Sequence, residues 1–366
     1  MKAATLVDLE DLRLGMVPDP VCEPGGVIVK VGACAVCGTD VKVYHKGHRM
    51  LHLPRIIGHE VAGTIVEVGP EAEGLSVGQR VAVAPVVPCG TCHYCRRGIT
   101  GQCDSLAAIG YRWDGGYAEY MAVPALGVRA GIVNPLPDAV SFAEGALAEP
   151  LACAINGQEL SRISLGDTVA IIGAGPLGCF HVELARARGA VKVIATEASA
   201  ARLREAEALA APDVLIDAVN EDPIARVREE TGGRGADAVI VACSSAVAQV
   251  QALSMVAKRG SVNFFGGLPK GRSEIAIDSN LIHYGEFTVT GTSGSTAEQN
   301  RMALSLIASS RVRVGRYIGQ MAGLDGLAEG IRRCERGEGM KTIIVPGDDV
   351  GEGAGRLVPG VDSGGR

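Results

Sequence analysis

The sequence predicts an α/β protein with two domains, a doubly wound parallel sheet and a distorted β-barrel. The chain has 366 residues, which is enough for two domains. From Asp167 onward, apolar strands alternate with amphipathic helices, as in a parallel sheet covered by helices. Residues 1–150 are instead glycine-rich and contain short alternating strands, which is typical of a β-barrel.

The barrel domain is expected to be discontinuous in sequence. Its first part contains the strands GGVIVKVGA, EVAGTIVEVG and QRVAVAPVV. After about residue 290 come two helices, AEQNRMALSLIAS and LDGLAEGIRRCERG, and the strand KTIIVPG. We therefore assign residues 1–152 and 290–346 to the barrel domain and 153–289 to the sheet domain. Residues 347–366 have little apolar content, and we expect them to form a disordered tail.

The sheet domain begins with a strand, a glycine turn and a helix, in DTVAIIGAGPLGCFHVELARARGA. The turn has the spacing G-x-G-x-x-G. Its first glycine turns the chain, its second lets the backbone approach a pyrophosphate, and its third lets helix and strand pack closely. The phosphates of a dinucleotide would lie at the helix N-terminus. The predicted loop residues are Gly173, Gly175, Pro176, Leu177 and Gly178.

An acidic residue ends the next predicted strand, VKVIATE. It is Glu197, nineteen residues after Gly178, where a carboxylate binds the ribose hydroxyls and repels a 2′-phosphate. NAD is therefore favoured over NADP. Arg202 lies close by; taken alone, it is an ordinary solvated helix arginine. The further strands APDVLID, ADAVIVACSS, GSVNFFGGL and EFTVTGTSG bring the sheet to six strands.

Four cysteines occur within fifteen residues, in CGTCHYCRRGITGQC. Short loops with two-residue gaps bring thiolates to the ~2.3 Å bonds of tetrahedral zinc. Because four protein ligands leave no open position, such a zinc is structural. The alternatives are an iron–sulfur cluster, or four thiols without a metal, with or without a disulfide between two of them. The residues are Cys89, Cys92, Cys95 and Cys103.

A second candidate metal site is of mixed type and consists of Cys37, His59, Glu60 and Glu149. A thiolate, an imidazole and a carboxylate with one open position are typical of a catalytic zinc. Glu149 precedes Pro150 in the apolar run GALAEPLACAING, where a carboxylate is costly to bury without a cation. Each residue alone has an ordinary explanation: a small buried cysteine, a core histidine or a helix-start acid. Only their combination indicates a metal.

Two neighbours of Cys37 have expected roles in this site. Asp40 is a candidate to accept the second N–H of His59, because a ligating histidine usually donates that proton to a carboxylate or carbonyl. Thr39 is a candidate to hydrogen-bond a zinc-bound alcohol and pass its proton outward. A structural role, in which Thr39 caps a turn, explains this residue as well as the proton-relay role does.

Composition and charge exclude several classes of protein. The net charge of −6 gives no reason to expect nucleic acid or an acidic membrane as partner. No apolar run reaches the ~18 residues that span a bilayer. The N-terminus MKAATLVDLEDLRL is not uniformly apolar, as a signal peptide would be. We expect a cytoplasmic protein whose eleven cysteines stay reduced.

Six ordered motifs resemble the zinc-dependent medium-chain dehydrogenases. They are GACAVCGTDV, GHEVAGTIVEVG, the four-cysteine segment, DGGYAEYMAVP, EPLACA and GAGPLG. This resemblance implies a GroES-like catalytic domain, a Rossmann domain, and a cleft between them that holds zinc and nicotinamide. The GHE glutamate and the glutamate before proline resemble the sorbitol (polyol) dehydrogenase branch. Relatives form homodimers or homotetramers, often through the sheet edge near EFTVTGTSG.

The resemblance also implies residue roles. Cys37, His59 and Glu60 would surround a catalytic zinc, with Glu149 binding directly or through water. Glu197 and Arg202 match the ribose contacts of the branch, which strengthens NAD. Two zinc ions are then expected in each chain, one catalytic and one structural. The fourth Rossmann strand departs from the family by ending in VACSS, where relatives often have a small residue and glycine. A second departure is Lys42, which replaces a proton-relaying histidine and leaves His45 as the candidate.

The expected reaction is oxidation of a secondary alcohol of a polyol, sugar or cyclitol to a ketone, with NAD as acceptor. Zinc would lower the pKa of the alcohol, and the nicotinamide would take the hydride. One alternative is oxidation of L-threonine, for which Arg49, Arg55 or Arg112 would bind the carboxylate. The other is a non-catalytic dinucleotide-binding protein on the same fold.

Overall fold

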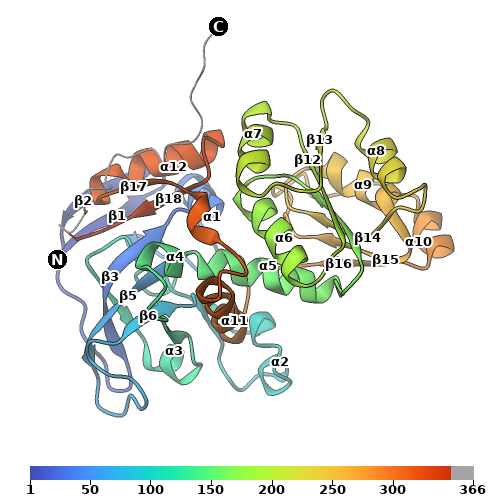
Figure 1. Cartoon of the computed structure of the whole chain (residues 1–366). Coiled ribbons are helices and arrows are strands. Elements are labelled where there is room, and N and C mark those ends of the chain that lie inside the picture. The colour runs from blue at the N-terminus through green and yellow to red at the C-terminus, as the bar shows by residue number, and fades with distance from the viewer. Residues whose placement is uncertain (348–366) are drawn as a thin grey trace, which may run out of the picture. The chain divides into compact units, whose positions relative to one another are not determined.

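The computed structural model describes residues 1–347, which pack into two compact units (Figure 1). The first unit contains Met1–Glu149, Ser295–Ala308 and the residues from Val314 onward, and the second contains Pro150–Gly294 and Ser309–Arg313. The sequence places the boundaries at 152/153 and 289/290, whereas the units divide at 149/150 and 294/295. The predicted tail, apart from Gly347, lies outside the described residues.

The first unit is built mainly of antiparallel strands. Its largest sheet has the order β10-β6-β5-β3-β18-β17, and β9 also pairs with β3. Two smaller sheets are β2-β1-β4 and β7-β8. The strands are β1 (Lys2–Asp8), β2 (Asp11–Met16), β3 (Val27–Ala35), β4 (Arg55–Ile56), β5 (Glu60–Val68), β6 (Arg80–Val83), β7 (Val86–Val87), β8 (Ala107–Ala108), β9 (Tyr120–Val123), β10 (Val133–Pro135), β17 (Ile318–Ala322) and β18 (Lys341–Ile344).

The helices of this unit are short and lie around the barrel. They are α1 (Gly38–Lys46), α2 (His93–Arg96), α3 (Ala125–Arg129), α4 (Phe142–Ala146), α11 (Ala297–Ala308) and α12 (Leu327–Arg336), with 3-10 turns at Thr100–Gln102, Val314–Tyr317 and Leu324–Gly326. Helix α5 (Ala148–Leu160) begins in this unit and continues into the second. The C-terminal strand β18 pairs with β3, so the last described residues lie beside those that precede Cys37.

The second unit is a six-stranded parallel sheet of order β13-β12-β11-β14-β15-β16. Figure 1 shows α6 and α7 on one face and α8, α9 and α10 on the other. The strands are β11 (Thr168–Ile172), β12 (Lys192–Glu197), β13 (Val214–Asp217), β14 (Ala236–Val241), β15 (Val256–Phe264) and β16 (Thr288–Gly291). The helices are α6 (Pro176–Ala187), α7 (Ala200–Leu209), α8 (Pro223–Glu230), α9 (Ala246–Met255) and α10 (Ser279–Gly285).

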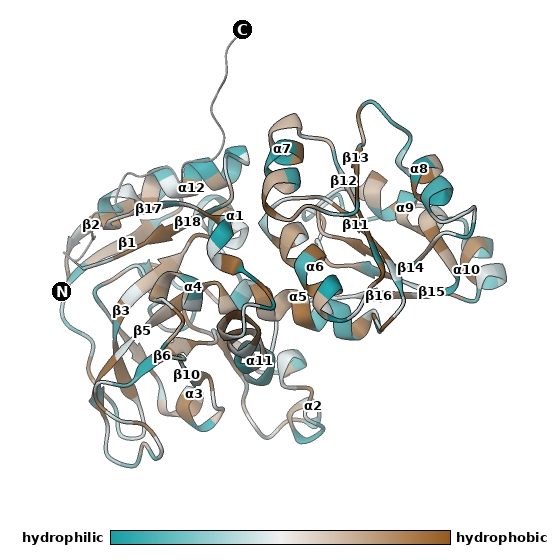
Figure 2. Ribbon diagram, in the orientation of Figure 1, coloured by the Kyte–Doolittle hydropathy of each residue, from teal (hydrophilic) through white to brown (hydrophobic). Residues whose placement is uncertain are grey.

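Burial explains the composition of this sheet. All residues of β11 are buried, because helices cover both faces of a doubly wound sheet. Figure 2 accordingly shows β11 and β14 as brown, apolar strands, whereas α8 carries teal, hydrophilic residues. The six predicted strands and the doubly wound order are confirmed. Among residues 1–347, no helix combines the length and apolarity needed to cross a bilayer.

Candidate metal centres and nucleotide-binding loop

Two groups of potential metal ligands stand out among the described residues, and both lie in the first unit. In each group, the candidate ligand atoms lie within 4.8 Å of one another. One group is Cys89, Cys92, Cys95 and Cys103, and the other is Cys37, His59 and Glu60. The sequence predicted both sets, except that the second does not include Glu149.

The four-cysteine group is held by local turns. Cys92 caps α2, and its Sγ accepts a bond from the N–H of Cys95 at 3.5 Å. The N–H of Cys89 lies 3.2 Å from Cys103 Sγ, which ties the fourth cysteine to the first. Gly90 has a φ of +77°, so a glycine is needed where the chain turns between the first two cysteines.

The chemistry of these thiols suits a metal. Hydrogen bonds, first from the backbone of Thr91, lower the pKa of Cys89 to about 6 and favour its thiolate. All eleven cysteines lie within the described residues, and none of them forms a disulfide. Four convergent sulfurs are the donor set of a structural zinc and leave no position for a substrate.

The mixed group begins at the junction of β3 and α1. Cys37 is the N-cap of α1, and its sulfur accepts a bond from the N–H of Thr39 at 3.4 Å. Asp40 completes the capping box by accepting the N–H of Cys37 at 2.9 Å. The segment CGTD therefore starts a helix and fixes the thiol at its beginning. Thr39 Oγ1 lies 3.5 Å from Cys37 Sγ.

His59 and Glu60 enter the group from the start of β5. His59 Nδ1 lies 3.3 Å from Asp40 Oδ1, at ion-pair distance but without hydrogen-bond alignment. Asp40 also accepts a bond from the hydroxyl of Tyr117 at 2.8 Å. Burial alone would raise the pKa of Asp40, but the charge of His59 and these hydrogen bonds outweigh it and lower that pKa. Asp40 therefore stays an anion beneath the imidazole.

The unsatisfied atoms of this group indicate what it can hold. Glu60 is completely buried, and its Oε1 has no hydrogen-bond partner among the described residues. A partnerless buried carboxylate oxygen is costly unless a cation or donor binds it. Together with a thiolate and an imidazole, it forms a donor set suited to zinc. The residues present therefore fit a metal ion.

A lysine that sequence reasoning missed also reaches this group. Lys341, the first residue of β18, donates to Glu60 Oε2 at 2.5 Å and to the carbonyl of Val36 at 2.8 Å. Burial lowers the pKa of Lys341, but the charges of Glu60 and Cys37 outweigh it and raise the net value. The signal was a lysine heading the otherwise apolar strand KTIIVPG.

Glu149 is not a member of this three-residue group. It is buried and belongs to the first turn of α5. Its charge adds to the influences that raise the pKa of Tyr111, of which burial is the largest. The ring of Tyr111 lies 5.8 Å from that of His59 and 4.8 Å from that of His48, measured between centroids. An aromatic wall thus borders the metal-ligand group on this side.

The two candidates for an outward proton path differ in their surroundings. Lys42 is exposed on α1. His45 lies between two carboxylates, 2.5 Å from Glu10 and 3.1 Å from Glu335. The hydrogen bond that His45 donates to Glu10 is the main reason that the pKa of His45 is raised. His45 is therefore engaged in surface ion pairs.

The glycine loop of the second unit has the features of a phosphate site. A Cβ at position 178 would lie 1.9 Å from the carbonyl oxygen of Gly173, so only glycine lets α6 approach β11 this closely. Helix α6 begins at Pro176 and has Gly175 as its N-cap, with no side-chain capping bond. Side chains cap α7, α8 and α9 instead. The uncapped N–H groups of α6 fit a bound anion.

Glu197 and Arg202 adjoin this loop. Glu197, at the end of β12, accepts the N–H of Ala174 at 2.8 Å and that of Ser199 at 2.9 Å. The guanidinium of Arg202 lies over Gly175, where a Cβ would be 2.1 Å from its Nη1. The sequence predicted both residues as ribose contacts, and the structure places both beside the glycine loop.

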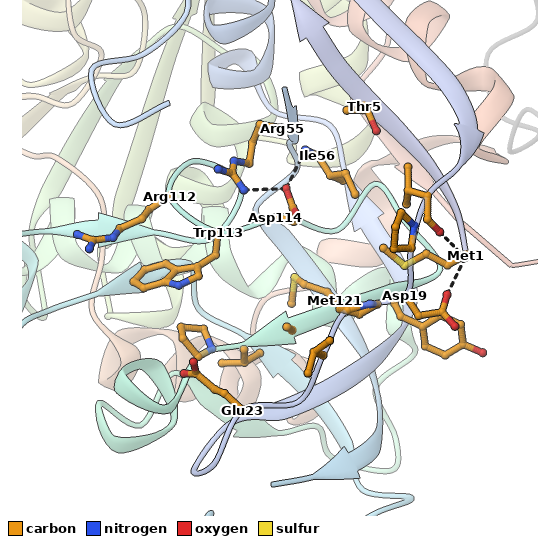
Figure 3. Close-up of a pocket in the computed structure, with 18 of the residues that line it drawn as sticks. Met1, Thr5, Asp19, Glu23, Arg55, Ile56, Arg112, Trp113, Asp114 and Met121 are labelled. Carbon is orange, nitrogen blue, oxygen red and sulfur yellow. Dashed lines mark hydrogen bonds and ion pairs between the residues drawn. The ribbon is translucent and has the colours of Figure 1, made fainter. Parts of the chain in front are cut away.

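A cavity of about 530 Å³ lies in the first unit, and Figure 3 shows the residues that line it. Arg55 and Arg112 line it, two of the arginines considered above for a substrate carboxylate. Arg55 Nη1 pairs with Asp114 at 3.0 Å, and Arg112 stacks on Trp113 with its Cζ 5.5 Å from the ring centroid. None of Cys37, His59 and Glu60 lines this cavity.

Two family descriptions match the chain. The alcohol dehydrogenase GroES-like domain matches residues 23–135, and the zinc-binding dehydrogenase domain matches residues 176–309. L-threonine 3-dehydrogenase of Pyrococcus furiosus is 33% identical over 335 residues, covering 90% of this chain and 93% of that protein. The chain belongs to the zinc-dependent medium-chain dehydrogenases.

Further relatives of this medium-chain dehydrogenase support the polyol branch. Sorbitol dehydrogenase of Bombyx mori is 31% identical over 353 residues, covering 93% of this chain and 97% of that protein. A crystal structure described as a zinc-binding dehydrogenase from Sinorhizobium meliloti, bound to NADP, has a TM-score of 0.87 at 30% identity. It covers 94% of this chain and 99% of that one. The predicted GroES-like and Rossmann folds are confirmed.

Proposed function

We propose that this dehydrogenase oxidises a secondary alcohol of a polyol, sugar or cyclitol to the ketone and passes the hydride to NAD. The observation that carries the proposal is the group of half-buried Cys37 with buried His59 and Glu60, in which one carboxylate oxygen of Glu60 has no partner among the described residues. These three residues would hold a catalytic zinc, and Glu149 remains the candidate to bind it directly or through water. Zinc supplies Lewis-acid chemistry there, which lowers the pKa of a substrate hydroxyl group.

The chain's own residues would orient the substrate and move its proton. Thr39, beside Cys37 at the start of α1, would accept the proton of the substrate hydroxyl group while it gives its own hydroxyl proton onward to solvent. Asp40 would hold the His59 ring in one orientation through its carboxylate. Because His45 is engaged by Glu10 and Glu335, the proton would leave by way of solvent near Lys42.

The glycine loop supports a dinucleotide as the second substrate. The uncapped start of α6 would bind the pyrophosphate, and the carboxylate of Glu197 would accept hydrogen bonds from the ribose hydroxyl groups. A 2′-phosphate would approach this carboxylate unfavourably, which favours NAD. Arg202 would contribute a further ribose contact. The nicotinamide ring accepts the hydride when the cofactor is bound.

Oxidation of L-threonine is the second candidate, because L-threonine 3-dehydrogenases are among the most similar relatives. It requires a cation for the carboxylate of the amino acid. Arg55 and Arg112 line the separate cavity of Figure 3, which leaves Arg49. Arg49 is exposed and follows His48, whose ring contacts Tyr111.

A substrate screen tests these alternatives. NADH or NADPH formation would be followed with sorbitol, xylitol, inositols, sugars and L-threonine, with zinc-loaded protein and each cofactor. We expect turnover with NAD and a hydroxyl-rich substrate, and at least about tenfold lower kcat/KM with NADP. Turnover of L-threonine alone, with a KM that rises on Arg49→Ala, would favour the second candidate. No turnover, with fewer than two zinc ions per chain, would favour a non-catalytic dinucleotide-binding protein.

We also propose a cytoplasmic homodimer or homotetramer. The edge strand β16 supports this assembly, because three of its four residues are exposed and its outer edge has no neighbouring strand among the described residues. An exposed edge strand can pair with the same strand of a second copy.

A further inference from the structure

We propose that Lys341 is a positioning residue that keeps Glu60 a weak, single-oxygen metal ligand. The inference rests on the proposed metal role of Cys37, His59 and Glu60. By this means β18, the last strand of the described residues, would keep a coordination position open for substrate. Lys341 lies 281 residues from Glu60 in sequence, so no local motif connects them.

The first argument is the division of the Glu60 carboxylate. Lys341 Nζ donates to Oε2 at 2.5 Å, whereas Oε1 has no partner in the described structure. The side chains of both residues are buried, with 7% and 0% exposed. A buried carboxylate with one oxygen held by an ammonium group offers only the other oxygen to a metal. Bidentate binding, which would fill an extra position, is thereby disfavoured.

The second argument is that Lys341 also reaches the neighbour of Cys37. Its ammonium donates to the carbonyl of Val36 at 2.8 Å, and the N–H of Val36 donates to the carbonyl of Thr342 at 2.8 Å. Strand β18 is thus in fixed register with the end of β3. The lysine therefore links the backbone before one ligand to the carboxylate of another.

The third argument is electrostatic. An ammonium group this close to the candidate ligands repels a metal cation in a water-poor site, where charges interact strongly. Its positive charge also partly neutralises the negative charge of the Glu60 carboxylate. Both effects weaken the bond between Glu60 and a metal, so that substrate can compete for the position.

The test measures zinc release to a colorimetric chelator from full-length, zinc-loaded protein. The kinetic phase that is missing in Cys37→Ser belongs to the mixed group. We expect Lys341→Met to slow this phase at least about tenfold, because repulsion is removed and Oε2 is freed. Lys341→Arg should stay within about threefold of wild type, since it keeps the cation. Lys192→Met, which removes the 2.5 Å pair with Glu230 in the other unit, is the matched control.

The direction of the change separates positioning from simple support. If Lys341 only holds the strands together, Lys341→Met releases zinc faster than wild type, and the proposal is overturned. Unchanged release would also overturn it. If no zinc is bound at the Cys37 group of the wild type, the proposed function fails, whatever Lys341 does.

A double variant keeps the test decisive if Lys341→Met does not fold. Glu60→Gln alone removes the negative charge that balances the ammonium group beside the metal and should speed zinc release about tenfold or more. Adding Lys341→Met removes that charge and should reverse most of the effect. A double variant that releases zinc as fast as Glu60→Gln, or faster, would contradict the proposal.

Discussion

The two units build their sites in opposite ways. In the first unit, buried charged side chains converge from α1, the start of β5 and β18. Lys341 on β18 bonds to Glu60, which lies 281 residues away in the sequence, and to the carbonyl of Val36, which lies 305 residues away. In the second unit, the glycine loop and Glu197 lie within a single strand–helix–strand segment, residues 168–197. The first site depends on side-chain chemistry and sheet register, whereas the second depends on local backbone geometry.

This difference determines how each site should fail. Removing a ligand atom should destroy the first site but leave its fold, because the capping and strand pairing around it remain. Adding a single methyl group should damage the second site, because its function lies in close backbone approach. Substitutions of these two kinds test whether the units are as independent as their construction indicates.

The largest effect is expected from Cys37→Ser. The serine can still cap α1, but it replaces the thiolate that a zinc ion binds. We expect kcat to fall by roughly three orders of magnitude or more, as for loss of an essential metal. Zinc should fall from two ions per chain to one, and the Kd for NAD should stay within about twofold. Activity assays, metal analysis and NAD titration measure the three quantities.

Retained turnover in Cys37→Ser would refute the catalytic role of the mixed group. A matched control is Cys22→Ser, which alters a half-buried cysteine outside both metal-ligand groups. That variant should keep activity and both zinc ions.

Gly178→Ala should have the next largest effect, and it should fall on the other unit. The new Cβ would lie 1.9 Å from the carbonyl oxygen of Gly173, so the loop must move. We expect the Kd for NAD to rise roughly a hundredfold, equivalent to about 2.7 kcal/mol. Both zinc ions should remain. Gly291→Ala is the control, since its Cβ would meet nothing closer than 3.9 Å.

If Gly178→Ala binds NAD normally, the close approach in the loop does not limit binding. If instead it loses zinc as well, the two units are coupled more strongly than their separate construction indicates. Equilibrium fluorescence titration and metal analysis on the same sample distinguish the two outcomes.

The same difference explains what could be predicted from the sequence. The sheet order and glycine loop follow from local patterns, because each strand–helix pair is continuous in the chain. The four-cysteine group was also recognisable, since its ligands lie within fifteen residues. Cys37, His59 and Glu60 were recognisable only in combination, because each of them alone has an ordinary explanation. Lys341 was missed because its role depends on the register of β18 beside β3, which no local pattern encodes.

Glu149 is a residue that the sequence identified as unusual without determining what its side chain contacts. The sequence indicated that this carboxylate needs a nearby cation, and burial in α5 agrees with that need. The metal-ligand group nevertheless forms without it. A position before proline identifies an unusual residue, but it does not determine the atom that the side chain will contact. Its assignment as a ligand therefore stays a prediction.

Cys95→Ser compares the two metal-ligand groups within the first unit. A closed four-thiolate site contributes folding energy and holds no substrate. We expect the temperature of unfolding to fall by roughly 5–10 °C, from a loss of about 2–3 kcal/mol. Turnover at 25 °C should remain within about threefold of wild type. A variant with unchanged fold and assembly but no hydride transfer would contradict the structural role.

The smallest effect concerns acid stability of the second unit, through His181 on α6. This side chain is completely buried, and burial lowers its pKa to about 3. Its ring meets Phe265 edge-on at 4.6 Å between centroids. Gln158 lies 3.4 Å from its Nδ1, and no carboxylate contributes to the shift. The ring is therefore neutral in the folded protein.

The sign of the pH dependence follows from linkage. In the unfolded chain, this histidine has a pKa of about 6.5, so between about pH 6.5 and pH 3 the unfolded state binds more protons. The stabilising contribution is complete above pH 6.5 and is lost as pH falls, at most ~1.4 kcal/mol per pH unit. His181→Leu should therefore lose less stability than wild type between pH 7 and pH 5, measured by urea unfolding.

The substitution leaves one bond of Gln158 in place, because Gln158 also donates to the backbone carbonyl of residue 181 at 2.8 Å. Because zinc loss in acid affects both proteins equally, the difference between them isolates the histidine. The exposed His52 is the control, and equal pH dependence in His181→Leu and His52→Gln would show that the buried imidazole does not govern acid stability.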